Sequence, residues 1–149
     1  MATLHRAARI GDYNAVVAEL ASGANVNAIS IHRFSALMLA AREGHAAIVR
    51  LLLKAGADTE LAHPNGRAAL DFAASKGNLE VVLLLVAFGA NINARSRNGT
   101  TPMNAAAQWA HTNVVTFLRE CGADDTAQEW LDVGGVVGSF EKNRASKST

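Results

Sequence analysis

Apolar residues stand at helical spacing in short segments that recur along the chain. The clearest segments are 48–53, 81–86 and 114–118, where apolar positions one, three or four residues apart share one helix face. A shorter, alanine-rich segment precedes each of them, as in 35–43. Glycine follows most of these segments, and glycine just past a helix end readily supplies the left-handed backbone that closes the helix. The pattern therefore predicts an all-α chain of short helix pairs.

The helix pairs recur every 33 residues, and three sets of positions repeat in register. These sets are Leu4, Leu37, Leu70 and Met103; Gly11, Gly44, Gly77 and Ala110; and Gly23, Gly56, Gly89 and Gly122. A fixed period of this length indicates supersecondary units that stack into a solenoid. We expect one domain over residues 1–125, with repeats at about 1–27, 28–60, 61–93 and 94–125.

The period is lost after the fourth repeat. Residues 126–140 include Trp130 and Leu131, which we expect to cover the end of the stack, because terminal units of solenoids need a cap. Residues 141–149 are polar and charged. Such a composition cannot bury enough apolar surface to fold alone, so we predict a disordered tail.

The fourth repeat carries the fullest motif. It has Gly99 in a turn, then Thr101-Pro-Met-Asn104, a second helix and finally Gly122-Ala123. This order resembles the ankyrin repeat, whose signature is a turn, T-P-L-H-x-A-A, a glycine, a second helix and G-A-x-V-N-A. The resemblance covers about residues 1–125. It implies an ankyrin-repeat solenoid of helix-turn-helix units joined by β-hairpin-like loops, with a concave face that binds a partner protein.

Two positions depart from the glycine pattern. Arg33 stands where the next two repeats have Gly66 and Gly99, and Ala110 stands where the other repeats have the glycine between helices. If the backbone keeps a positive φ there, each side chain adds strain of roughly 1 kcal/mol. The alternative is a different local turn.

Composition narrows the class of protein. The net charge of +1 argues against nucleic-acid binding, for which a strongly basic domain is expected. Cys121 is the single cysteine of the 149 residues, so a disulfide framework is excluded and a reducing compartment is favoured. The longest apolar run, 81–88, is too short to span a bilayer. We expect a cytoplasmic, monomeric protein without membrane insertion.

Catalytic and metal-binding motifs are missing from the sequence. The five histidines are scattered, and no Cys/His cluster has the spacing of a zinc site. Neither the phosphate-binding loop G-x-x-x-x-G-K-[ST] nor the nucleophile elbow G-x-S-x-G occurs. We therefore expect a protein that is not an enzyme and that needs no cofactor or metal.

The resemblance also implies which residues face a partner, namely those at the loop tips and at the exposed end of each first helix. The residues predicted to bind are Ile10, Ile29, Ile31, Phe34, Arg42, Arg67, Lys76, Arg95, Arg97 and Trp109. With Arg9, this face holds six basic residues against one acid, Glu43. Arginine and aromatic residues are frequent anchors of protein interfaces.

Simpler interpretations of the same residues remain open. The charges could merely be solvated, and Ile29, Ile31 and Phe34 could pack on one another at their loop. Trp109 could cover the turn at Ala110. On the opposite side of the third repeat, Leu83 and Phe88 could mark a second contact or simply pack locally.

The leading functional hypothesis is a non-enzymatic adaptor, scaffold or inhibitor that binds an acidic, partly apolar segment of another protein. One alternative is a substrate of asparaginyl hydroxylation, because Asn27 and Asn93 stand in the V/I-N-A setting that resembles its target in ankyrin proteins. A turn asparagine that bonds its own backbone is the simpler interpretation of both. A further alternative is a regulatory subunit of a larger complex.

Overall fold

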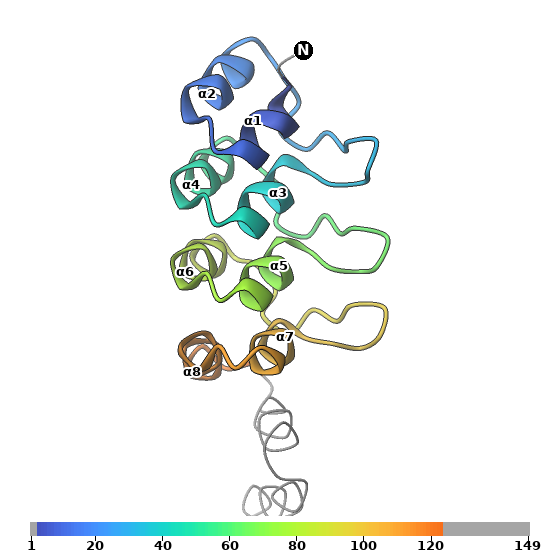
Figure 1. Ribbon diagram of the computed structural model, residues 1–149, viewed down its shortest axis with the longest axis vertical. Coiled ribbons are helices and arrows are strands. Elements are labelled where there is room, and N and C mark those ends of the chain that lie inside the picture. The colour runs from blue at the N-terminus through green and yellow to red at the C-terminus, as the bar shows by residue number, and fades with distance from the viewer. Residues whose placement is uncertain (1–2, 124–149) are drawn as a thin grey trace, which may run out of the picture.

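The computed structural model describes residues 3–123, which form a stack of helix pairs (Figure 1). The first helices of the pairs are α1 (Leu4–Ile10), α3 (Ala36–Glu43), α5 (Ala69–Lys76) and α7 (Pro102–Gln108). The second helices are α2 (Tyr13–Ala21), α4 (Ala46–Lys54), α6 (Leu79–Ala87) and α8 (Thr112–Glu120). The predicted all-α solenoid is confirmed. The predicted cap at 126–140, with Trp130 and Leu131, and the predicted tail at 141–149 lie outside the described residues.

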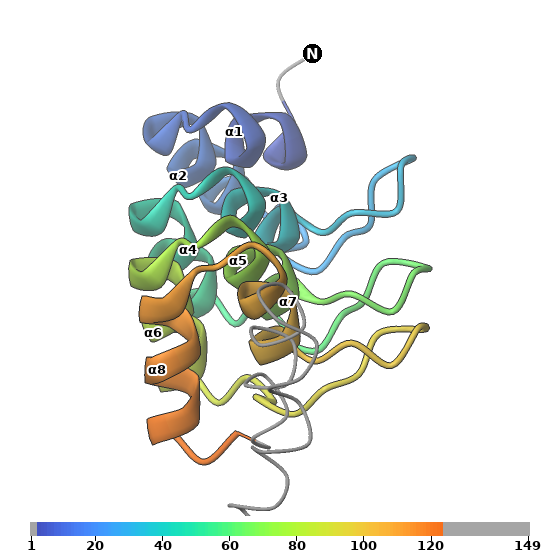
Figure 2. The same cartoon turned by 60° about the horizontal axis from the view of Figure 1, so that its bottom comes forward.

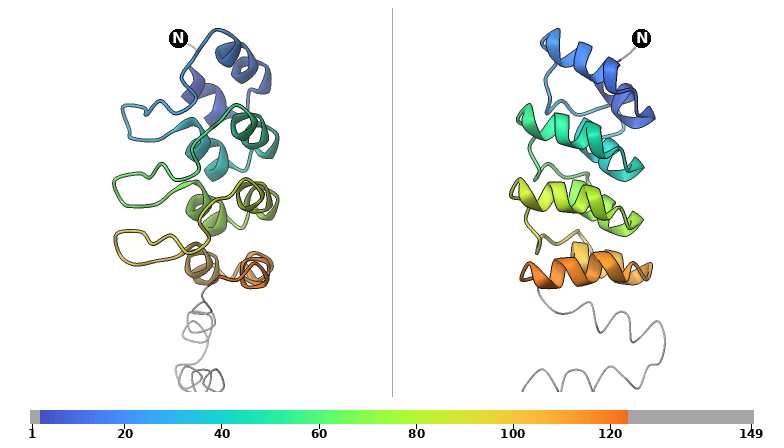
Figure 3. Two further views of the ribbon diagram at one scale, coloured as in Figure 1. Left: turned by 180° about the vertical axis from the view of Figure 1, so that it is seen from behind. Right: turned by 90° about the vertical axis from the view of Figure 1, so that its left-hand side faces the viewer.

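The first helices form the inner column of the stack, beside the loops (Figures 1 and 3). The inner three, α3, α5 and α7, are buried almost all round, as the six consecutive buried residues 36–41 of α3 and 102–107 of α7 show, whereas α1 at the end of the stack buries one face. Alanine is small enough to let neighbouring helices approach, and Leu37 and Met103 fill the space between repeats. The first helices consequently make the main contacts from one repeat to the next.

The second helices form an outer layer and bury one face each (Figure 3). In α4 the buried residues are Ile48, Val49, Leu52 and Leu53, as the helical spacing predicts. The opposite face of this layer leaves apolar side chains exposed, among them Leu83 and Phe88 of α6 and its C-cap. Within residues 3–123, every helix is too short or too polar to cross a membrane.

Loops that join the repeats project from one side of the helices (Figure 2). Each is closed by the same backbone hydrogen bond, which the residue at 30, 63 or 96 donates to the carbonyl four positions later. Gly66 and Gly99 adopt φ of +82° at the loop tips, and Arg33 adopts +70°. Ala110 likewise keeps a φ of +59°. The turns thus keep the same backbone shape from repeat to repeat. Arg33 and Ala110 consequently occupy the left-handed region that L-amino acids disfavour.

Side chains of the turn between helices connect successive repeats. His45 Nε2 donates to the Arg9 carbonyl at 3.0 Å, and His111 Nε2 donates to the Ser75 carbonyl at 3.1 Å. The glycine of the preceding turn leaves room for this ring, since a Cβ on Gly77 would lie 2.5 Å from His111 Nδ1. Among the described residues, no later repeat places such a ring against Ala110. A side chain there therefore costs backbone strain without a clash.

Candidate interaction groove

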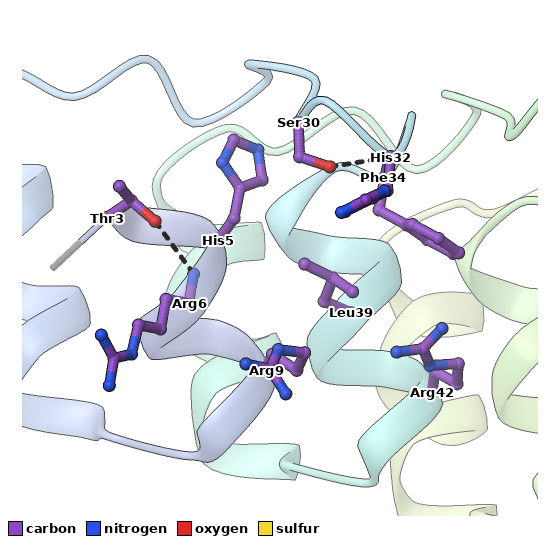
Figure 4. Close-up of a pocket in the computed structure, with 9 residues that line it drawn as sticks. All are labelled: Thr3, His5, Arg6, Arg9, Ser30, His32, Phe34, Leu39 and Arg42. Carbon is purple, nitrogen blue, oxygen red and sulfur yellow. Dashed lines mark hydrogen bonds between the residues drawn. The ribbon is translucent and has the colours of Figure 1, made fainter. Parts of the chain in front are cut away.

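Two hollows lie between the loops and the first helices, and we call the surface that carries them the groove. The first has a volume of about 410 Å³ and is formed by α1, the loop before α3, and α3 itself (Figure 4). It is lined by Thr3, His5, Arg6, Arg9, Ser30, His32, Phe34, Leu39 and Arg42. The second hollow, also about 410 Å³, is lined by Arg67, Ser75, Lys76, Trp109 and His111.

An aromatic cluster of Phe34, His63 and Phe72 lies between the two hollows. The Phe34 ring centroid is 4.7 Å from that of His63 and 5.7 Å from that of Phe72, with the rings tilted in both pairs. Tilted pairs at these distances add favourable aromatic contacts to the apolar burial. The loop of the second repeat is therefore fixed against the first helix and the loop of the third.

Two guanidinium groups lie over the faces of this cluster. Arg42 Cζ is 4.9 Å from the Phe34 centroid, and Arg67 Cζ is 5.1 Å from the Phe72 centroid. Cation–π contacts of this length hold a long side chain in place. Because Arg42 and Phe34 line the first hollow while Arg67 lines the second, the cluster joins both hollows into one groove surface.

Among residues 3–123, the charges of the groove are largely uncompensated. Between residues that the structure describes, the one ion pair joins Arg42 Nε to Glu43 Oε2 at 3.0 Å. In this part of the chain, no acidic side chain lines either hollow. The surface thus offers positive charge beside half-buried aromatic rings, a combination that suits an anionic, partly apolar ligand.

The structure separates the apolar residues that the sequence grouped. Ile29 pairs with Ser35 through an isolated antiparallel bridge, and Ile31 is 90% exposed at the loop tip. The interpretation that these residues pack with Phe34 is wrong for Ile31, because Phe34 turns instead toward His63 and Phe72. Ile31 stays exposed in the loop of the second repeat.

Other predicted residues fall in three places. Arg95 Nη1 donates to the carbonyl of Gly99 in its own loop, at 3.1 Å, and Arg97 is exposed at the tip of that loop. Lys76 and Trp109 line the second hollow, where Trp109 is 63% exposed. Ile10 lies apart from the other predicted residues. It ends α1 beside a smaller hollow lined by Arg6, Ala7, Asp12 and Ala15, so it does not extend the apolar loop tip.

Asn27 connects two repeats. Its Oδ1 accepts a hydrogen bond from the Asp58 amide of the next repeat, at 2.7 Å, so the bond does not run to its own backbone as the simpler interpretation expected. Glu60, 33 residues later, has the same role, since its Oε2 accepts from the Asn91 amide at 3.2 Å. Asn93 is the next residue in this series. Hydroxylation of Asn27 and Asn93 stays a prediction.

Phe72 is the groove residue that sequence reasoning missed. It is 6% exposed and lies under Arg67. The other repeats have Arg6, Leu39 and Ala105 at this position. The sequence therefore marked Phe72 only as the one aromatic residue among four equivalent repeat positions. Its importance depends on the ring of the neighbouring loop, which a repeat pattern does not reveal.

A buried carboxyl group lies at the start of the same helix. Asp71 is 2% exposed, and its Oδ2 accepts from the Ala68 amide at 3.0 Å. Burial raises the pKa of Asp71 to about 6, whereas the Ala68 hydrogen bond and the Arg67 charge act to lower the pKa. The group belongs to the helix cap beneath the groove. The described part of the chain has no group of three or more His, Cys, Asp and Glu side chains placed to hold a metal ion.

Comparison with known protein families gives a consistent assignment. A model of three ankyrin repeats matches residues 4–96, and a model of a single ankyrin repeat matches residues 98–129. No curated protein matches the chain.

Proposed function

Because this chain belongs to the ankyrin-repeat family, we propose that its groove binds an acidic, partly apolar segment of a partner protein. Ankyrin repeats are protein–protein interaction modules and are generally not enzymes. In this role the protein would serve as an adaptor, scaffold or inhibitor, with the repeats as a rigid support.

Two cation–π contacts between the hollows support the proposal most strongly. Arg42 lies over the Phe34 ring, and Arg67 lies over the Phe72 ring. Each ring orients its cation, so less side-chain entropy is lost when a carboxylate binds. Arginine also presents several N–H groups in a planar fork that matches a carboxylate. The groove thus combines ordered cations with apolar surface in one continuous strip.

Trp109 and Ile31 add exposed apolar surface to this side of the stack. Both are well exposed, and Trp109 lines the second hollow together with Lys76. Large apolar side chains at such positions commonly supply most of an interface's affinity, while charges steer the encounter and set its salt dependence. We therefore assign affinity to the apolar residues and selectivity for acidic segments to the basic ones.

Display of random peptides on phage tests this assignment without a known partner. Peptides selected on the wild-type protein are expected to be rich in Asp and Glu with interspersed apolar residues, and to bind more weakly as salt rises. The double variant Phe34→Ser and Trp109→Ser is expected to lose at least about tenfold in affinity. Circular dichroism would first establish that it is folded.

Two further variants make the result specific. Arg67→Glu with Lys76→Glu keeps the aromatic cluster and reverses the charge of the second hollow, so it should weaken acidic peptides as well. Leu83→Ser with Phe88→Ser changes exposed apolar residues of the outer layer and serves as the matched control. Selection of basic peptides, or loss of binding in the control alone, would contradict the proposed groove.

A further inference from the structure

We propose that the first hollow binds a phosphorylated side chain of the partner segment. This inference rests on the proposed function, because it assigns a chemistry to one end of the groove. The other end would take carboxylates and an apolar side chain.

Three arginine residues from two repeats line the first hollow, and in Figure 4 the guanidinium group of Arg6 points away from those of Arg9 and Arg42. Arg6 and Arg9 come from α1 and Arg42 from α3, and among the described residues no acidic side chain lines the hollow. In Figure 4, Arg9 and Arg42 lie at the C-terminal ends of their helices, and Ser30, His32 and Phe34 lie across from them on the loop. The hollow is thus bounded by donors on both sides.

The donors of the hollow are largely unused by the part of the chain that the structure describes. Among residues 3–123, the side chains of Arg6 and Arg9 have no hydrogen-bond partner, and Arg42 uses its Nε for Glu43. Ser30 Oγ accepts from the Phe34 amide at 3.2 Å, which leaves the hydroxyl hydrogen to donate. His5 is fixed beside the hollow, since its Nε2 donates to the Ala28 carbonyl at 2.7 Å.

This set of donors suits a phosphate group better than a carboxylate. A phosphorylated side chain carries nearly two negative charges at neutral pH and three strong acceptor oxygens. A carboxylate has one charge, and a single arginine fork already matches both of its oxygens. The guanidinium groups of Arg9 and Arg42, with the Ser30 hydroxyl, therefore exceed what one carboxylate needs, and Arg clusters are the usual receptors of phosphorylated motifs.

The second hollow differs in a way that gives the bound segment a direction. It has one guanidinium, that of Arg67, one ammonium, that of Lys76, and the exposed ring of Trp109. Such a site suits a carboxylate beside an apolar side chain. We infer that the phosphorylated residue lies at the first two repeats and the apolar residue near the fourth.

Three peptide libraries with the same degenerate flanks test the inference, with phosphoserine, glutamate or serine at the central position. The wild-type chain is expected to retain the phosphoserine library about tenfold more strongly than the glutamate library, since the phosphate adds charge and acceptors. Retention of the serine library should be weakest.

Matched variants locate the effect. Arg9→Gln with Arg42→Gln removes two guanidinium groups from the hollow and is expected to reduce the tenfold preference to about parity. Arg50→Gln with Lys54→Gln removes the same charge from exposed positions of α4 in the same repeat, and it should keep the preference. Circular dichroism verifies the fold of both.

The outcomes separate this inference from the proposed function. Equal retention of the phosphoserine and glutamate libraries by the wild type would overturn the phosphate site and leave the groove's preference for acidic segments standing. Retention of neither library would overturn the proposed function itself. A phosphoserine preference that survives in the Arg9/Arg42 variant would also overturn the assignment to the first hollow.

Discussion

The groove and the outer layer both expose apolar side chains, yet they differ in what surrounds them. On the groove, Arg42 and Arg67 lie over aromatic rings that are half-buried or buried. On the outer layer, a hollow of about 360 Å³ between α4 and α6 has Arg50 and Glu80 at its edge, so its charges are mixed. Exposed apolar area alone therefore does not distinguish the two faces. Ordered cations over aromatic rings do.

Phe72 and Phe88 provide the sharpest form of this comparison. Phe72→Ala removes a ring that is 6% exposed and is expected to lower the free energy of unfolding by about 3 to 4 kcal/mol. Phe88→Ala removes a ring that is 45% exposed and should cost less than about 1 kcal/mol. Urea unfolding followed by circular dichroism measures both. Equal losses would mean that the groove wall is no better packed than the outer face.

The buried carboxyl under the groove wall should make stability depend on pH. Asp71 has a pKa of about 6 in the folded chain against an ordinary 3.8, so the folded state binds the proton more tightly than the unfolded state does. The contribution of Asp71 to the free energy of unfolding is then fully present below about pH 4 and falls by roughly 2 to 3 kcal/mol as the pH rises through about 6. Asp71→Asn should remove this fall and stabilise the protein at neutral pH.

The fourth repeat offers the reciprocal change. Asn104 holds the position of Asp71, is buried, and caps α7 together with Thr101. Asn104→Asp should introduce a fall in stability between the same pH values, because the new carboxylate would be buried as well. The wild type, Asp71→Asn and Asn104→Asp are compared by unfolding curves across this pH range. If the free energy of unfolding changes equally with pH in all three, the burial of Asp71 has no energetic consequence.

Arg33 tests a smaller effect at the loop of the second repeat. Arg33→Gly relieves a φ of +70° and is expected to raise the free energy of unfolding by about 1 kcal/mol. Ala110→Gly should give a similar gain at the turn between α7 and α8, where φ is +59°. A thermal unfolding series measures both. A loss of stability in Arg33→Gly would indicate that the arginine side chain makes contacts worth more than the strain.

The outer layer should be the least sensitive region. Leu83→Ser with Phe88→Ser is expected to change the free energy of unfolding by about 1 kcal/mol or less, because both side chains are more than two-fifths exposed. Its affinity for peptides selected on the wild type should not change. Weakened binding with retained stability would place the interaction on the outer face and reverse the comparison.

The fold could be predicted from the sequence because the residue type at each repeating position has a local physical cause. The glycines close helices, and the apolar spacing of 48–53 sets which face of α4 is buried. The groove followed only in part. The pattern selected Phe34, Arg42, Arg67, Lys76 and Trp109, which do line the groove, but their function as a binding site stays a prediction.

What the sequence could not provide depends on contacts between repeats. Phe34 and Ile31 look equivalent as apolar loop residues, yet one ring packs on Phe72 and the other side chain is 90% exposed. The raised pKa of Asp71 likewise depends on burial. The position of Asp71 in the repeat motif does not reveal how deeply its carboxyl group is buried. Ile10 is predicted to face the same partner as the loop residues, but the direction of its side chain along α1 cannot be read from spacing.

The most direct test of the groove is a nuclear magnetic resonance titration of the wild-type chain with an acidic, partly apolar peptide selected on it. The largest chemical-shift changes are predicted at Phe34, Arg42, Arg67, Phe72 and Trp109, and the affinity should fall as salt is added. Shifts centred on Leu83 and Phe88, or an affinity that does not respond to salt, would contradict a basic groove as the binding site.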